Sequence, residues 1–360
     1  MKKVFISDCE GPISKNDNAF ELVASYIPKG ERLFTVISRY DDVLSDVLKR
    51  RGYKAGDTLK LILPFLKAYG ITNRKMRIFS AKTLILISNV KYTLQHVQEI
   101  MHTFIVSTSY EHYIRALCRT LRFPFENTYC TKVDIDRYEL NQKEKKWLRK
   151  IAREIAEMPI IEIPREARSM NDFSKEHQKT LQRLDEIFWR EMAGLEVGKI
   201  LEEVNPIGGS EKANAVKRTI EALGIGLEEV MYIGDSITDV DAFNLVKQNG
   251  GLTVSFNGNR YAVKNSDVSV LSENSVVTAV IAELFKFSGK DETMKVLEHW
   301  SRRTIKKTRL NPVLLKRLFT VYPGELPKVK IVSKENVEAL VRESEKFRKR
   351  VRGEAVGRLG

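Results

Sequence analysis

Acidic side chains follow two short apolar segments that lie far apart in the sequence. Asp8 and Glu10 come just after residues 4–6, and Asp235 and Asp239 follow a second such segment. Carboxylates within about 5 Å of one another repel by several kcal/mol at an effective dielectric near 20. They stay ionised together only with a cation among them, and carboxylate oxygens suit a hard ion such as Mg²⁺. If the two segments are neighbours in the fold, the sequence predicts a magnesium site.

A hydroxyl group and a lysine complete a set of side chains suited to a phosphate group. Ser107 follows the apolar run 103–106, and Lys212 stands at the opening of the helical pattern 213–223. At the start of a helix, the free N–H groups and the helix dipole both favour an anion, as does a lysine charge. Metal, lysine and hydroxyl together predict a phosphate pocket.

The elements that would position these residues alternate between short apolar strands and amphipathic helices. Strands are predicted at 4–6, 103–106, 230–233, 252–256 and 268–271, and helices at 90–100, 111–121, 213–223 and 275–285. This alternation predicts an α/β fold with a doubly wound parallel sheet. Ligands of such sheets bind beyond the carboxyl ends of the strands, so Asp8, Ser107 and Asp235 would meet at one edge if their strands are neighbours.

Two mainly helical stretches interrupt the α/β pattern, and a basic stretch follows it. The predicted parts are a core of 1–13, 81–136 and 205–287, a helical cap at 14–80, a second helical insertion at 137–204, and a helical basic extension at 288–360. The net charge of the whole chain is +14, and the extension carries about ten of these charges. Such a balance suits anionic partners.

Cysteine content and hydropathy exclude several classes of protein. Cys9, Cys118 and Cys130 are too few and too scattered for a disulfide framework or a paired-cysteine zinc site, and we expect a cytoplasmic protein. Cys9 does not suit a nucleophile, because the neighbouring carboxylates raise the pKa of its thiol. No apolar run approaches the roughly 18–20 residues of a membrane-spanning helix.

The four polar segments, in this order, resemble the motifs of the haloacid dehalogenase (HAD) superfamily, in its phosphatase branch. Asp8-Cys9-Glu10-Gly11 matches the first motif, a strand that ends in Asp-x-Asp-Gly. Ser107 matches the second motif and Lys212 the third, while Gly234-Asp235 and the later Asp239 match the fourth. The helical insertion between the first two motifs is similar to the cap of phosphoserine-phosphatase-like members. A group of archaeal phosphatases that includes subunit R of an energy-converting hydrogenase has a similar Asp-x-Glu-Gly opening.

The resemblance implies a Mg²⁺-dependent phosphatase that acts on a small phosphorylated metabolite. Asp8 would attack phosphorus and form an aspartyl phosphate, which water then hydrolyses. Glu10 would protonate the leaving oxygen and later activate the water.

The resemblance also implies which residues bind the metal and the phosphate. Asp8, the main-chain carbonyl group of Glu10, and Asp235 would hold the metal, with Asp239 as a direct or water-mediated ligand. Ser107 would donate a hydrogen bond to a phosphoryl oxygen, and Lys212 would pair with the transferred group.

Two positions depart from the family pattern. Glu10 stands where Asp is usual, and its carboxylate reaches about one methylene farther; a misplacement of roughly 1 Å can lower a rate on the order of a hundredfold. Pro12 stands where Thr or Ser is common, which removes an N–H group from the first loop. The loop after Ser107 lacks the glycine pair of phosphoserine phosphatases, so serine phosphate is not assumed as the substrate.

Other interpretations of the same residues stay open. The chain could be a non-catalytic or weakly active subunit that binds a partner protein through the basic extension 288–360. It could also transfer phosphoryl groups on a nucleotide or RNA-related substrate, with nucleic acid bound by the same extension. Asp8 and Glu10 could cap a helix, and Lys217 competes with Lys212 as the lysine of the third motif.

Overall fold

A seven-stranded sheet forms the centre of the computed structural model, which describes every residue except 1–2, 165, 358 and 360. The strands are β1 (Val4–Ser7), β2 (His102–Tyr110), β3 (Thr128–Thr131), β4 (Val230–Gly234), β5 (Leu252–Phe256), β6 (Val268–Leu271) and β7 (Lys328–Ile331). Their order is β3-β2-β1-β4-β5-β6-β7, and all neighbours are parallel except β6 and β7. The predicted α/β fold class is confirmed.

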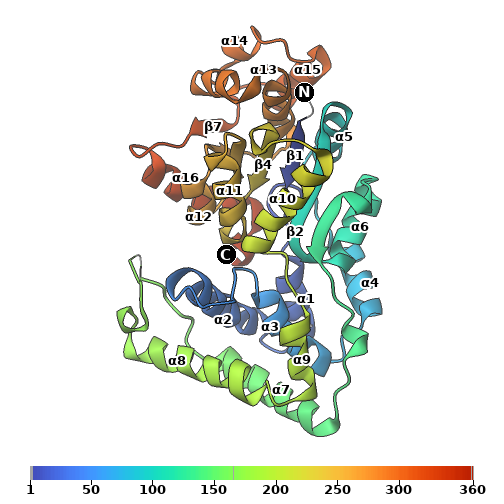
Figure 1. Cartoon of the computed structure of the whole chain (residues 1–360), viewed down its shortest axis with the longest axis vertical. Coiled ribbons are helices and arrows are strands. Elements are labelled where there is room, and N and C mark those ends of the chain that lie inside the picture. The colour runs from blue at the N-terminus through green and yellow to red at the C-terminus, as the bar shows by residue number, and fades with distance from the viewer. Residues whose placement is uncertain (1–2, 165, 358, 360) are drawn as a thin grey trace.

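Helices cover both faces of this sheet (Figure 1). One face packs against α5 (Val90–Ile100), α6 (Glu111–Leu121) and α13 (Val276–Glu298), and the other against α10 (Ser210–Leu223), α11 (Val240–Gln248) and α12 (Arg260–Asn265). Successive side chains of β1 point to opposite faces. Phe5 belongs to the hydrophobic cluster with α5, α6 and α13, and Ile6 belongs to the cluster with α10, α11 and α12. Each such fully buried side chain contributes about 1.5–3 kcal/mol to folding. The apolar side chains of the predicted strands therefore pack against helices on both faces of the sheet.

The extension 288–360 is mainly helical, but it also completes the sheet. It contains α14 (Arg302–Ile305), α15 (Pro312–Val321), α16 (Val337–Arg352) and α17 (Glu354–Gly357), and β7 pairs antiparallel with β6. β7 and β3 are not among the strands predicted from the sequence. Both are four-residue strands at the two edges of the sheet, and β7 alternates lysine with apolar residues, which weakens the signal of a buried strand.

The two helical insertions pack together as one cap. The first provides α1 (Asn18–Tyr26), α2 (Gly30–Asp42), α3 (Thr58–Ala68) and α4 (Asn73–Thr83), and the second provides α7 (Gln142–Glu157), α8 (Lys175–Glu186) and α9 (Lys199–Glu203). Their apolar faces share a single hydrophobic cluster, in which Phe188 packs against both Tyr40 and Phe65. The two insertions were predicted as separate units, because periodicity shows that a helix has an apolar face but not which partner covers it.

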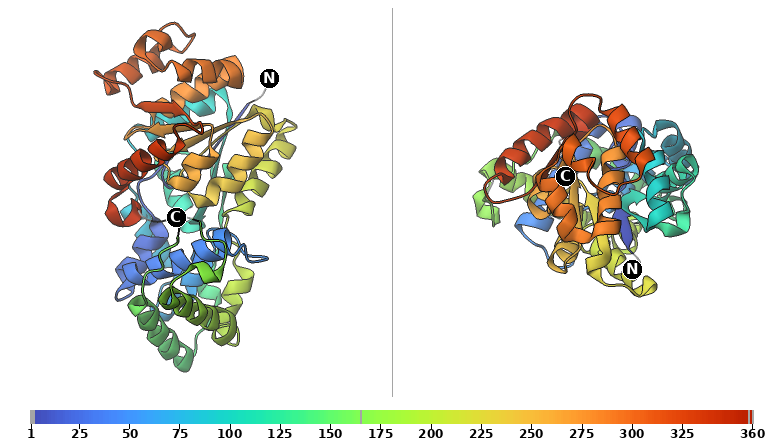
Figure 2. Two further views of the ribbon diagram at one scale, coloured as in Figure 1. Left: turned by 90° about the vertical axis from the view of Figure 1, so that its left-hand side faces the viewer. Right: turned by 90° about the horizontal axis from the view of Figure 1, so that it is seen from above.

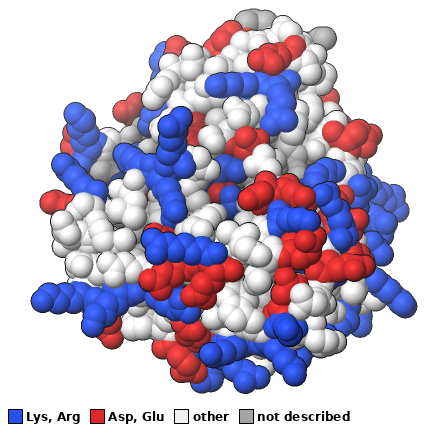
Figure 3. All heavy atoms as spheres, turned by 60° about the horizontal axis from the view of Figure 1, so that its bottom comes forward, with Lys and Arg blue, Asp and Glu red and all other residues white. Residues whose placement is uncertain are grey.

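The molecule is elongated, with the cap at one end, the sheet in the middle, and α14 and α15 at the other end (Figures 1 and 2). The cap end, brought forward in Figure 3, carries basic and acidic side chains that are interspersed rather than gathered by sign. Exposed ion pairs such as Lys29 with Glu157 and Arg137 with Glu203 belong to this mixture. Among the described residues, no helix combines the length and the apolar character that crossing a bilayer requires.

Candidate active site

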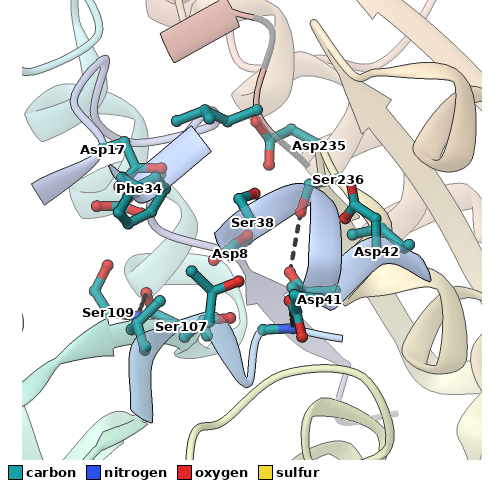
Figure 4. A pocket seen from close by; sticks show the side chains of 18 of the residues that line it. Asp8, Asp17, Phe34, Ser38, Asp41, Asp42, Ser107, Ser109, Asp235 and Ser236 are labelled. Carbon is teal, nitrogen blue, oxygen red and sulfur yellow. Dashed lines mark hydrogen bonds between the residues drawn. The ribbon is translucent and has the colours of Figure 1, made fainter. Parts of the chain in front are cut away.

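The carboxyl ends of three adjacent strands bring the candidate residues together. β1 lies between β2 and β4, and its last residue, Ser7, is in register with Ile105 on one side and Ile233 on the other. β1 and β4 end here and their loops leave the sheet, while β2 continues to Tyr110, so Ser107 reaches the same end of the sheet from within its strand. Figure 4 shows Asp8 near the middle of the pocket at this edge, with Ser107 and Ser109 on one side and Asp235 on the other.

Three buried carboxylates form the centre of the site. Asp8, Asp235 and Asp239 each offer an oxygen atom, and these oxygens all lie within 4.8 Å of one another. The main-chain N–H of Asp8 donates to the carbonyl oxygen of Ile233 at 2.8 Å, which ties the first loop directly to β4. The main-chain N–H of Cys9 donates to Asp8 Oδ1 at 2.6 Å. These bonds fix the Asp8 carboxylate relative to both strands.

Lys212 is a fully buried cation between two of these carboxylates. Its Nζ lies 2.7 Å from Asp8 Oδ2 and 2.8 Å from Asp239 Oδ1. Burial alone would lower the pKa of Lys212, but Asp239 and Asp8 raise it above its ordinary value, so the lysine stays charged. Lys217, the competing candidate, lies exposed on the same helix, whereas Lys212 is fully buried.

Asp239 holds the loop after β4 as well as the lysine. Its Oδ1 accepts from Lys212 Nζ and from the Tyr232 hydroxyl, each at 2.8 Å. Its Oδ2 accepts from the main-chain N–H groups of Asp235, at 3.0 Å, and Ser236, at 3.1 Å. With both oxygens engaged twice, the contacts of Asp239 favour a positioning role or a water-mediated one over direct metal binding.

Glu10 joins the first loop to the cap. Its Oε1 accepts from the main-chain N–H of Asn18, the first residue of α1, at 2.8 Å. Burial and the nearby Asp17 raise the pKa of Glu10 well above its ordinary value, against the effect of the Asn18 N–H. A carboxyl group in this environment favours its protonated form, which is the form that a general acid needs.

Two hydroxyl groups lie within the second half of β2, because this strand runs on to Tyr110 and does not end at residue 106 as the sequence predicted. Ser107 is buried, and its Oγ accepts from the main-chain N–H of Ser109 at 3.1 Å. The Ser109 hydroxyl is also buried and lines the pocket, and it has no hydrogen-bond partner within the described structure. Ser109 was not among the predicted site residues, although its place two residues after Ser107 was a signal for it.

The cap supplies the opposite wall of the pocket. Phe34, Ser38, Asp41 and Asp42 all come from α2 and line the cavity. Oδ2 of Asp41 accepts from the main-chain N–H of Gly56 at 2.9 Å, and its carboxyl group also pairs with the Tyr53 hydroxyl. Burial and the nearby acids raise the pKa of Asp41 to about 7. The cap therefore presents hydrogen-bonding groups to whatever the cavity encloses.

Two arginines from the extension also reach the site. Arg348 Nη1 donates to Asp235 Oδ2, and Arg352 Nη1 donates to the same oxygen at 2.8 Å. Both belong to α16, four residues apart, so they lie on the same helix face. From the sequence, both belong with the other basic residues of the extension. The signal for their burial was their spacing of four from Ser344 on a face that begins with Leu340.

The charges around the pocket leave room for a divalent cation. Five carboxyl groups and three basic groups meet here: Asp8, Glu10, Asp17, Asp235, Asp239, Lys212, Arg348 and Arg352. With Glu10 protonated, the four remaining carboxylates exceed the three basic groups by one negative charge, which favours a bound cation. Burial raises the pKa of Asp8 to about 8 even though Lys212 opposes the shift, so ionised Asp8 needs a further cation. The residues thus fit a divalent metal held by Asp8 and Asp235.

Gly11 permits the close approach of the first loop to Asp235. Its φ of +106° lies in the region that favours glycine, and a Cβ at this position would overlap the Asp235 carboxyl group. We expect Gly11→Ala to lower turnover by about a hundredfold, because Asp235 must move. Gly52→Ala is the matched control, since Gly52 also has a positive φ of +76° but would meet nothing within 4 Å.

Steady-state kinetics and thermal unfolding of the two variants separate overlap from backbone strain. Both variants should lose about 1–2 kcal/mol of stability through strain, but only Gly11→Ala should lose activity. Equal activities would mean that the contact between Gly11 and Asp235 does not shape the site.

Sequence comparison identifies the family. Residues 70–283, more than half of the chain, match the model of the haloacid dehalogenase-like hydrolases. The chain belongs to this family. The predicted membership of the HAD superfamily is therefore confirmed. Among curated proteins, none has a sequence significantly similar to that of this hydrolase.

Several solved structures are similar to this chain. Gene product AF1437 from Archaeoglobus fulgidus is 28% identical, with a TM-score of 0.80 over 100% of this chain and 99% of that one. Phosphoserine phosphatase in its apo form is 11% identical, with a TM-score of 0.41 over 80% of this HAD-like hydrolase and 99% of that chain. Its substrate-bound complex is 10% identical, with a TM-score of 0.43 over 76% and 95%. The similarity to the hydrogenase-subunit group stays a prediction.

Proposed function

We propose that this HAD-like hydrolase is a Mg²⁺-dependent phosphatase of small phosphomonoesters, with Asp8 as its nucleophile. The observation that carries the proposal is the setting of the Asp8 carboxylate. It is buried, lies 2.7 Å from Lys212 Nζ, and is placed with Asp235 at the carboxyl ends of β1 and β4. A carboxylate with a fixed cation and a second acid beside it suits nucleophilic attack on phosphorus.

The first half of the reaction breaks the ester bond. A carboxylate oxygen of Asp8 bonds to phosphorus, the bond between phosphorus and the leaving oxygen breaks, and that oxygen takes its electron pair. Glu10 gives its proton to the leaving oxygen, which departs as an alcohol. The environment of Glu10 raises its pKa, and this supports its role as the acid.

The second half restores the enzyme. Glu10, now ionised, takes a proton from water as the water oxygen attacks phosphorus, and the bond between phosphorus and the Asp8 oxygen breaks. Lys212 and the hydroxyl groups of Ser107 and Ser109 would bind the phosphoryl oxygens. A Mg²⁺ ion held by Asp8 and Asp235 would reduce the repulsion between the carboxylate and the phosphate dianion.

The size of the pocket supports a small substrate. Its volume is about 90 Å³, whereas a single water molecule needs roughly 10–15 Å³. A phosphate group with a short leaving group fits such a space without movement of the cap, and larger substrates would need the cap to open. The polar side chains of Ser38 and Asp41 in the pocket wall support a leaving group that carries a hydrogen-bonding group.

We also propose that the protein acts in the cytoplasm. Cys9, Cys118 and Cys130 are free thiols, which supports a reducing compartment such as the cytoplasm. An archaeal source, and a protein or nucleic-acid partner of the extension 288–360, stay predictions of the sequence. Arg348 and Arg352 would not take part in such a surface, since both are buried against Asp235.

Assay of phosphate release tests the proposal. With an aryl phosphate and then a panel of small phosphorylated metabolites, we expect turnover with Mg²⁺ and at least a hundredfold loss after chelation with EDTA, because Asp8 needs a cation to stay ionised beside Asp235. Restoring Mg²⁺ should restore the rate. Release that is indifferent to chelation, or none from any phosphomonoester in the panel, would count against a metal-dependent phosphatase.

A further inference from the structure

The extension returns to the boundary between the core and the cap, where α16 meets the site (Figures 1 and 2). Its arginines are not surface groups, because the side chains of Arg348 and Arg352 are only 3% and 4% exposed. Arg350, which lies between them on the same helix, is 64% exposed and pairs with Glu273 on the surface. The helix thus directs two of its three arginines in this turn inward, to one carboxylate.

Each buried arginine is held by contacts besides Asp235. Arg348 Nη1 also donates to the carbonyl oxygen of Asp235 at 3.2 Å, so this guanidinium binds both the side chain and the backbone of one residue. Arg352 Nε donates to the carbonyl oxygen of Lys15 at 3.0 Å, and its Nη2 donates to that of Asn16 at 2.7 Å. Arg352 therefore connects the loop after β4 with the segment that leads into α1.

The end of the extension is anchored on both sides of the site. The Ser344 hydroxyl donates to the carbonyl oxygen of Gly258 in the core, and α16 packs against α12. Beyond α16, Val356 and Leu359 belong to the hydrophobic cluster of the cap. With anchors in the core and in the cap, α16 cannot shift without breaking contacts at one end, so the two guanidinium groups are fixed in place.

Two fixed positive charges beside Asp235 oppose the binding of a divalent cation to the same carboxylate. Even at the dielectric of water, a unit charge about 5 Å from a divalent ion changes its binding constant by about a factor of ten or more. In a buried site the screening is weaker and the effect is larger. When no metal is bound, the same charges compensate the Asp235 carboxylate. Without them, Asp235 would be a buried carboxylate that lacks a cation of its own.

We infer that Arg348 and Arg352 are positioning residues of the candidate active site, which hold Asp235 in place and lower its affinity for the metal ion. The extension then contributes two side chains to the site. The inference rests on the proposed function in one respect, the assignment of Asp235 as a metal ligand.

Calorimetric titration of the full-length protein with Mg²⁺ tests this inference without any substrate. Arg352→Ala should bind Mg²⁺ at least about tenfold more tightly than the natural protein, because one opposing charge is gone. Arg352→Lys keeps the charge and should bind Mg²⁺ within about threefold of the natural protein. Arg350→Ala is the matched control, since this exposed arginine of the same helix does not contact Asp235, and its affinity should not change.

Thermal unfolding provides a second readout. Without metal, Arg352→Ala should unfold at a lower temperature than Arg350→Ala, and Mg²⁺ should raise its midpoint by more than it raises that of the control. Arg348→Ala should behave in the same way, and Arg352→Ala preserves the test if the Arg348 variant does not fold.

The two parts of the account fail in different ways. If the natural protein and every variant bind no Mg²⁺, the metal site of the proposed function is wrong and the inference falls with it. If the natural protein binds Mg²⁺ but Arg352→Ala binds it equally or more weakly, the inference is overturned while the metal site stands. Tighter binding by Arg352→Ala that Arg352→Lys reverses is the result that supports it.

Discussion

Replacing Asp8 with Asn should lower phosphate release by about four orders of magnitude or more, the scale of loss seen when a nucleophile is removed. The amide oxygen of Asn cannot form the ester bond to phosphorus that a carboxylate forms. Shape and hydrogen bonding are nearly preserved, because the Asn oxygen can still accept from Lys212 Nζ. The fold should therefore survive, and relief of the repulsion from Asp235 and Asp239 should offset part of the lost ion pair.

Circular dichroism, thermal unfolding and kinetics with saturating Mg²⁺ check this result. Asp291→Asn is the matched control, since this aspartate is exposed and lies in the distal part of α13, and it should retain full activity. An Asp8→Asn protein that releases phosphate at more than about a hundredth of the natural rate, free of contaminating activity, would show that Asp8 is not the nucleophile.

Removal of the buried lysine should affect stability as strongly as activity. Lys212→Met leaves Asp8 and Asp239 without their shared cation, and breaking a buried ion pair in this way typically costs about 3–5 kcal/mol. Turnover should also fall, because Lys212 both orients Asp8 and binds the transferred group. Lys217→Met changes an exposed lysine of the same helix and should alter stability by less than about 0.5 kcal/mol.

Urea unfolding of the two variants, each with and without Mg²⁺, provides the measurement. Mg²⁺ should recover part of the stability of Lys212→Met, because the ion offsets the same carboxylates that the lysine offsets. If Lys212→Met and Lys217→Met prove equally stable and equally active, Lys212 does not serve the acidic cluster.

The sequence predicted the strands that carry the site because each has a strong local signal. β1, β4 and β5 are short β-branched or aromatic runs buried on both faces, and such runs end at polar residues where a parallel strand meets the edge of its sheet. Asp8 and Asp235 could thus be placed at strand ends before the strand order was known. That β1 lies between β2 and β4 depends on contacts between distant segments, and only the structure shows it.

The contributions of the cap and the extension could not be predicted for the same reason. An amphipathic pattern in α2 or α7 reports an apolar face, whereas their packing against each other depends on the fold of the chain between them. Arg348 and Arg352 share a helix face with Leu340 and Ser344, which indicates burial, but no local pattern names their partner, Asp235, which lies more than a hundred residues away.

Glu10 illustrates a departure from the family pattern that the structure explains in part. Its longer side chain reaches the main-chain N–H of Asn18, at the beginning of α1. The additional methylene therefore coincides with a contact to the cap, whose first helix begins next to the first loop. A shorter Asp at this position would lose that contact or would require α1 to lie closer.

Chemical trapping of the intermediate tests the central role of Asp8 most directly. The protein is mixed with substrate and Mg²⁺, quenched in acid and reduced with borohydride, which converts an aspartyl phosphate to homoserine, and the peptides are sequenced by mass spectrometry. Homoserine at position 8, formed only with both substrate and Mg²⁺ present and not in Asp8→Asn, is the predicted result. Phosphate release from a protein in which Asp8 is recovered unmodified, or with homoserine at another aspartate, would contradict the account.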